Sequence, residues 1–94
     1  MQSIDRKFKI QATSINSGNV YTENEAVCFL AKDRAFLMAL PAYLEACKTI
    51  GAGPDQLKAV ELMIERVREY QAANPHKVKV PDVDPVTEVG CLQK

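Results

Sequence analysis

Four lysines have the spacing that best fits a binding function. Lys7 and Lys9 alternate with apolar residues, and so do Lys77 and Lys79; this is the period of half-buried strands. On neighbouring strands the four ammonium groups would share one face and could bind RNA or another polyanion. Phe8 would point away from that face, and lysines on edge strands equally protect a sheet from aggregation. Polyanion binding is therefore an alternative, and nucleic acid is not the favoured partner.

No other group of side chains has the composition of a catalytic, cofactor or metal site. His76 is the only histidine, so a histidine-based triad or a multi-histidine metal site lacks its partners. Asp82 and Asp84 alternate, but no EF-hand loop surrounds them. Gly51 and Gly53 follow a predicted helix and not a strand, which argues against a phosphate-binding loop. We predict no catalytic residue, cofactor or metal, and favour a non-catalytic protein while leaving enzymatic activity open.

Composition and charge are those of a small globular protein. The chain has 94 residues, of which 47% are apolar and 26% charged, and this predicts one domain, residues 1–94. Twelve Lys and Arg balance twelve Asp and Glu. This neutral balance gives little electrostatic attraction toward bulk nucleic acid or an anionic membrane.

Cysteine usage and the start of the chain indicate the compartment. Cys28, Cys47 and Cys91 are an odd number without a CxxC pair, which favours reduced thiols in the cytoplasm. The first ten residues, MQSIDRKFKI, lack the apolar stretch of a signal peptide. The uncharged run at residues 35–44 is too short to span a bilayer. We expect a cytoplasmic protein with no membrane partner, and no motif identifies a family.

The N-terminal third predicts a β-hairpin followed by a helix start. Residues 7–21 alternate and then turn around Gly18, which can supply a positive φ. Thr22 and Glu25 match a capping box directly before an apolar run. They predict helical segments over residues 23–50, with these two residues as the N-cap.

Two residues could interrupt that helical region. Asp33 could cap a second helix instead of lying within the first. Pro41 has no N–H and crowds the preceding turn, at a cost of about 3 kcal/mol, so the helix should kink or break there. Gly51 can close the region in a left-handed conformation.

The second half of the chain completes an α+β fold. Residues 54–73 carry an apolar stripe at helical spacing and predict an amphipathic helix. The short connection predicts that it packs against the preceding helix as an antiparallel hairpin. Residues 76–80 alternate like a short strand, and residues 81–94 predict an extended tail that can fray.

The segment at residues 35–44 is apolar around its whole circumference, which is unusual in so short a chain. One neighbouring helix and a small sheet can cover only part of it, and monomers rarely expose large apolar patches. We predict a homodimer, a small interaction module that self-associates through Phe36, Leu37, Leu40 and Tyr43. The alternative is a binding protein or enzyme subunit with a pocket for an apolar ligand near Pro41.

Overall fold

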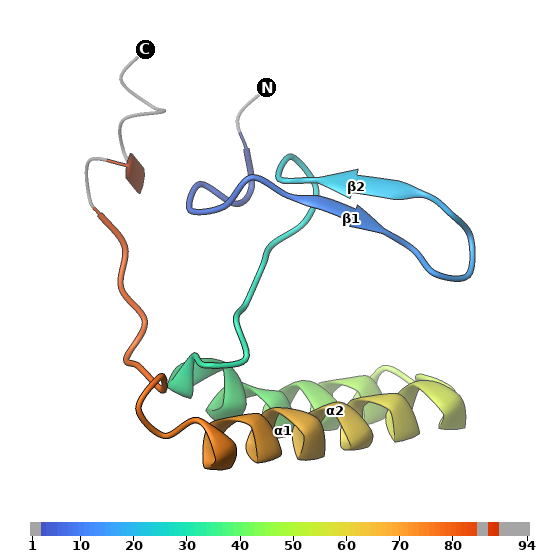
Figure 1. Cartoon of the computed structure of the whole chain (residues 1–94). Helices are drawn as coiled ribbons and strands as arrows, with labels where there is room; N and C mark the ends of the chain where they lie inside the picture. The colour runs from blue at the N-terminus through green and yellow to red at the C-terminus, as the bar shows by residue number, and fades with distance from the viewer. Residues whose placement is uncertain (1–2, 85–86, 89–94) are drawn as a thin grey trace. The chain divides into compact units, whose positions relative to one another are not determined.

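The computed structural model describes residues 3–84 and 87–88, which fall into two compact units. The first, the hairpin unit, contains the described residues up to Cys28 and those from Asp82 onward. The second, the helical unit, spans Phe29–Pro81. The predicted α+β order, a β-hairpin followed by two helices, is confirmed (Figure 1). That residues 1–94 form a single domain stays a prediction.

The hairpin is antiparallel and short. Strand β1 (Gln11–Thr13) pairs with β2 (Val20–Thr22), and Ala12 lies opposite Tyr21. Gly18 has a φ of 77°, so the positive φ expected in this turn is confirmed. None of the strand residues is buried, so the ribbon covers no apolar core.

Side-chain carboxylates shorten the first strand relative to the predicted hairpin. The N–H groups of Lys7 and Phe8 both donate to Oδ1 of Asp5 at 2.8 Å. The N–H of Ile10 donates to Oε1 of Glu23 at 2.9 Å. Because these backbone donors bind carboxylates, they are not available to a strand ladder. Phe8 and Ile10 are still less exposed than the lysines beside them, so the predicted alternation survives without the strand.

Asp5 is the buried polar centre of the hairpin unit, with 8% of its surface exposed. Its Oδ2 accepts the N–H of Cys28 at 2.8 Å. Burial by itself raises the pKa of Asp5, but the N–H groups of Cys28, Phe8 and Lys7, together with the Lys7 charge, outweigh it and lower the pKa below its usual value. The carboxylate therefore joins the start of the chain to the segment that follows the hairpin.

The helical unit is a pair of helices lying side by side (Figure 1). Helix α1 spans Arg34–Thr49 and α2 spans Pro54–Ala73; the second matches its predicted range, with Pro54 in the first turn. Gly51 has a φ of 82°, and its N–H and that of Ala52 donate to the last turn of α1 at 3.1 and 2.9 Å. This is the expected left-handed closure of α1.

The start of α1 differs from the prediction. The N-cap is Asp33, whose Oδ1 accepts the N–H of Phe36 at 3.0 Å. Thr22 ends β2, and Glu25 accepts the Thr22 N–H at 3.0 Å, but only one turn forms there. Residues 26–30 have no regular secondary structure. The prediction that Thr22 and Glu25 cap a helix beginning at residue 23 is therefore wrong, and Asp33 takes that role.

Pro41 lies inside α1, which is one unbroken helix; neither the predicted break nor the predicted kink is shown. Pro41 is exposed, and the carbonyl four residues earlier loses its helical donor. A missing N–H costs less at such a position than it would in the core.

The predicted strand at residues 76–80 is reduced to one parallel bridge between Lys79 and Asp33. The Lys79 N–H donates to the carbonyl of Lys32 at 3.0 Å, and the Arg34 N–H donates to the carbonyl of Lys79 at 3.1 Å. This segment thus pairs within the helical unit, beside the start of α1. Most of the predicted tail at residues 81–94, including Cys91, lies outside the described residues.

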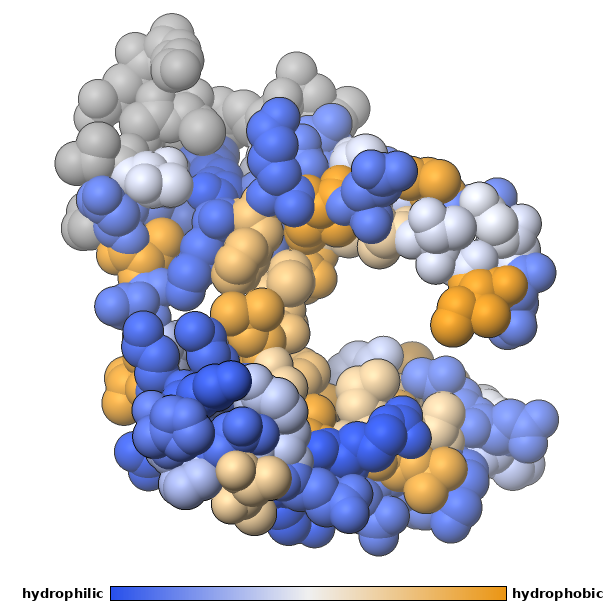
Figure 2. All heavy atoms as spheres, viewed as in Figure 1, coloured by the Kyte–Doolittle hydropathy of each residue, from blue (hydrophilic) through white to orange (hydrophobic). Residues whose placement is uncertain are grey.

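The apolar core of the helical unit lies between the two helices. Leu40 of α1 packs with Val60, Ile64 and Val67 of α2, and all four are buried. Phe36, Leu37 and Leu44 are partly buried against this cluster. The face of α2 turned to the viewer in Figure 2 is mostly hydrophilic, as expected for an amphipathic helix.

Candidate interaction groove

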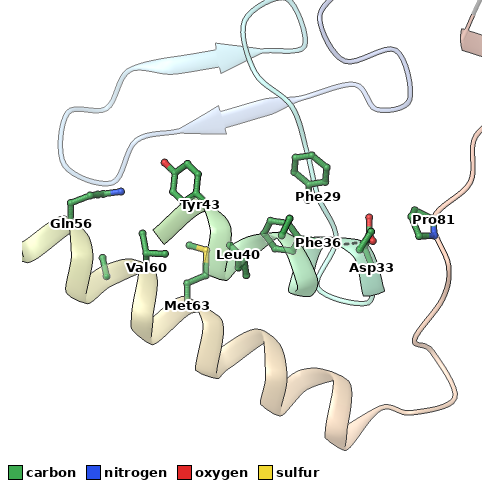
Figure 3. A pocket seen from close by; sticks show the side chains of 12 residues that line it. Phe29, Asp33, Phe36, Leu40, Tyr43, Gln56, Val60, Met63 and Pro81 are labelled. Carbon is green, nitrogen blue, oxygen red and sulfur yellow. Dashed lines mark hydrogen bonds between the residues drawn. The ribbon is translucent and has the colours of Figure 1, made fainter. Parts of the chain in front are cut away.

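The helical unit contains a groove of about 640 Å³ that is lined by both helices (Figure 3). From α1 it takes Ala35, Phe36, Ala39, Leu40 and Tyr43, and from α2 it takes Gln56, Ala59, Val60 and Met63. Phe29, Asp33 and Pro81, from the flanking segments, complete the lining. Leu40 and Val60 also belong to the buried core, so the groove lies directly over the contact between the helices.

The groove has two different ends. At one end Phe29 stacks on Phe36, with ring centroids 5.2 Å apart and the planes at 4°, an arrangement that contributes about 0.5–1.5 kcal/mol beyond burial. Asp33 and Pro81 lie at this end, whereas Tyr43 and Gln56 lie at the other (Figure 3). The groove is therefore bulky and anionic at one end and carries neutral polar groups at the other.

Hydrogen bonds fix the segment that forms the bulky end. The side-chain N–H group of Gln71 in α2 donates to the carbonyls of Ala31 and Asp33, both at 3.0 Å. These bonds hold the turn before α1 against α2. Phe29, two residues before that turn, is thereby brought to the groove.

The groove has little chemistry of its own. Asp33, Tyr43 and Gln56 are its polar side chains, and the Asp33 carboxylate already caps α1. Within residues 3–84 and 87–88, no group of three His, Cys, Asp or Glu side chains is placed to hold a metal ion. Cys28 is half-buried and Cys47 buried, both as free thiols. The groove is thus an apolar surface with three polar side chains.

The structure brings together most of the predicted interface. Phe36, Leu40 and Tyr43 line the groove, whereas Leu37 packs against the core without lining it. Leu40 is already buried by its own chain, so its role in any interface is at the base. Pro41, beside which the ligand pocket was expected, is not part of the lining.

Sequence reasoning missed the part of the groove contributed by α2 and by the segment before α1. Met63 widens the apolar stripe of α2, which is a signal that could have found it. Ala59 gives no such signal, because a small residue on a helix surface is unremarkable. Phe29 was placed in a helix, so its stacking on Phe36 could not be anticipated.

The polyanion-binding alternative assumes that the four lysines lie on neighbouring strands, and the structure does not place them so. Lys7 and Lys9 belong to the hairpin unit, and Lys77 and Lys79 to the helical unit. None of them lies in β1 or β2. The Lys7 ammonium donates to the carbonyl of Asp82 and lies 5.8 Å from the ring centroid of Phe8. Polyanion binding stays a prediction without its structural argument.

Comparison with protein-family models, with curated proteins and with solved structures found no match. Of the helices in the described part of the chain, neither is long and apolar enough to cross a membrane.

Proposed function

We propose that this chain is a small, non-catalytic interaction module that self-associates through the groove of its helical unit. The observation that carries the proposal is a continuous, almost uncharged surface across both helices. Two helices form a single layer, and a layer is stable when a second one covers its apolar side. A second copy of the chain supplies such a layer with the same chemistry.

The groove exposes large side chains on both helices. Tyr43 is 54% exposed and Met63 42% exposed, and they lie on different helices of the same groove. Their neighbours Leu40 and Val60 are buried, so the apolar surface continues into the core. Contiguous apolar patches of this kind mark binding surfaces.

A small apolar ligand is the second candidate, because the volume falls in the range of ligand pockets, about 300–1,000 Å³. Such pockets usually enclose the ligand and direct several polar groups toward it. Here the groove is only half enclosed, and two of the three polar groups, Tyr43 and Gln56, lie toward the same end (Figure 3). Self-association accounts better for an open surface.

The free thiols of Cys28 and Cys47 support action in the cytoplasm.

Adjacent residues of α2 provide a matched test of the proposal. Met63 lines the groove, whereas Leu62, which is 39% exposed against 42% for Met63, does not. We expect the wild type to sediment as a dimer at micromolar concentration. Met63→Glu places one charge per copy in the interface and should weaken dimerisation by about 100-fold or more.

Leu62→Glu carries the same charge on the same helix and should leave the dimer intact. A monomeric wild type would contradict self-association and favour the ligand alternative. Equal weakening by both variants would show that the dimer forms through a different surface.

A further inference from the structure

The surface of the groove alternates large and small side chains. Ala35 and Ala39 lie one turn apart on α1, and Ala59 faces the same groove from α2; all three are exposed. Tyr43 and Met63 project beside them as the large members. Helical layers interdigitate when large residues of one enter the spaces left by small residues of the other. One face that carries both kinds can therefore pack against a copy of itself.

Two-fold symmetry permits two ways of joining these faces while keeping the helices aligned. With the axis running along the groove, α1 would lie over α2 of the partner. Like ends would then meet: the Asp33 end of one copy would lie against the Asp33 end of the other. With the axis across the groove, α1 would lie over the partner's α1 in the opposite direction, and unlike ends would meet. The two ends of the groove decide between these arrangements.

Like ends are a poor match. The stacked Phe29 and Phe36 would face the same bulky pair of the partner, and the two Asp33 carboxylates would lie at the same end of the interface. Like charges that lose water on association oppose it. The opposite end would bring together the neutral polar groups of Tyr43 and Gln56, which can form at most neutral hydrogen bonds with each other and none to a carboxylate.

Unlike ends are complementary. A carboxylate can accept several hydrogen bonds, and Asp33 uses one oxygen for the N–H of Phe36. The Tyr43 hydroxyl and the Gln56 amide are donors at the opposite end of the groove. Residue 33 precedes residue 43 by about 15 Å along a helix, so the two Asp33 groups would lie beyond the screening length of about 8–10 Å.

We propose, on the basis of the proposed self-association, that the occupant of the groove is a second copy whose α1 crosses the first in the antiparallel direction. The two-fold axis passes close to Ala39, so that Ala39 faces Ala39 and the Asp33 end of each copy meets the Tyr43 end of the other. The product is a two-layer, four-helix assembly. Its interface should bury on the order of 1,200–2,000 Å².

Cysteine cross-linking tests the arrangement in a full-length chain whose own cysteines are removed by Cys28→Ser, Cys47→Ala and Cys91→Ser. Sedimentation first establishes that this parent keeps the association state of the wild type. Ala39→Cys should then form a disulfide dimer rapidly under mild oxidation, because a disulfide needs Cβ atoms about 3.5–4.5 Å apart. Met63 lines the groove nearly level with Ala39 on the antiparallel helix pair. A mixture of Ala39→Cys with affinity-tagged Met63→Cys should yield few mixed disulfides.

The alternative arrangement predicts the reverse: efficient mixed disulfides between positions 39 and 63, and little self-cross-linking at 39. That outcome, or a dimer without either cross-link, would overturn the antiparallel arrangement while leaving self-association intact. A monomeric wild type and parent would overturn both proposals, and the groove would then hold an apolar ligand or another part of the same chain.

Tyr43→Phe gives a second, milder readout. It keeps the ring and removes the donor, so the antiparallel arrangement predicts about tenfold weaker dimerisation. Unchanged affinity would contradict a bond to the partner's Asp33. In the alternative arrangement the same substitution removes at most a neutral hydrogen bond and should weaken the dimer less.

Discussion

Each of the two units of this protein is stabilised internally by a different physical interaction. All apolar side chains that are buried among the described residues belong to the helical unit: Leu40, Cys47, Val60, Ile64 and Val67. The buried side chain of the hairpin unit is instead the carboxylate of Asp5, with its three N–H bonds. One unit thus depends on non-directional burial and the other on charge-assisted hydrogen bonds.

This difference predicts which perturbation lowers the stability of each unit. An apolar core loses stability in proportion to the volume removed and is insensitive to proton concentration. A carboxylate-centred unit loses stability when its charge or its geometry is lost. Substitutions in the apolar core should therefore destabilise mainly the helical unit, and acid should destabilise mainly the hairpin unit.

The largest effect is expected from the apolar core. Ile64→Ala removes buried volume beside Leu40 and Val60 and should lower the free energy of unfolding by about 2–5 kcal/mol. Chemical denaturation followed by circular dichroism measures it. Leu62→Ala, on the exposed side of the same helix, is the control and should cost well under half as much.

A smaller loss is expected in the hairpin unit from Asp5→Ala. The N–H groups of Lys7, Phe8 and Cys28 would lose their acceptor, at about 1–3 kcal/mol for the unit. Hydrogen exchange should speed up at these three amides. Core amides of α2 in the same sample serve as the control; if they accelerate equally, the two units do not open separately.

Acid should imitate that substitution more weakly, because a protonated carboxyl keeps some capacity to accept. The pKa of Asp5 is lowered although burial opposes it, and the pKa of Glu23 is lowered by the N–H of Ile10. A carboxylate whose pKa is lowered in the folded state contributes its full stability at pH values above its unfolded-state pKa, which is about 3.9 for Asp and 4.3 for Glu. This contribution to stability is lost as the pH falls through the folded-state pKa.

Nuclear magnetic resonance spectra recorded from neutral pH downward measure this loss. The amides that bind the two carboxylates should shift and lose protection below about pH 4, while those in the core of α2 remain protected. Loss of protection in both units at one pH would argue against two independent means of stabilisation.

The smallest effects concern the two candidate helix caps. Asp33→Ala removes the acceptor for the N–H of Phe36 and should cost about 1 kcal/mol. Thr22→Ala removes only the 3.3 Å bond from the N–H of Asn24 and should cost at most about 0.5 kcal/mol. A larger loss for Thr22 than for Asp33 in thermal unfolding would restore the helix start predicted from the capping box.

The sequence by itself determined the features that depend on neighbours along the chain. The apolar stripe set the range of α2 because helical period and the first-turn proline are local properties. Gly18 and Gly51 were identified because a positive φ is accessible to glycine at little cost. Phe36, Leu40 and Tyr43 were placed on one surface because residues three and four apart share a helical face.

Only the tertiary structure decided the start of α1 and the far side of the groove. The Thr22 turn does not propagate because the N–H of Cys28 binds Asp5, 23 residues away, and the Gln71 side chain in α2 holds the carbonyls of Ala31 and Asp33. Hydrogen bonds between distant residues offset the modest local preference for helix. The contribution of Ala59 and Met63 likewise depends on how α2 is rotated against α1, which the packing of the shared core sets.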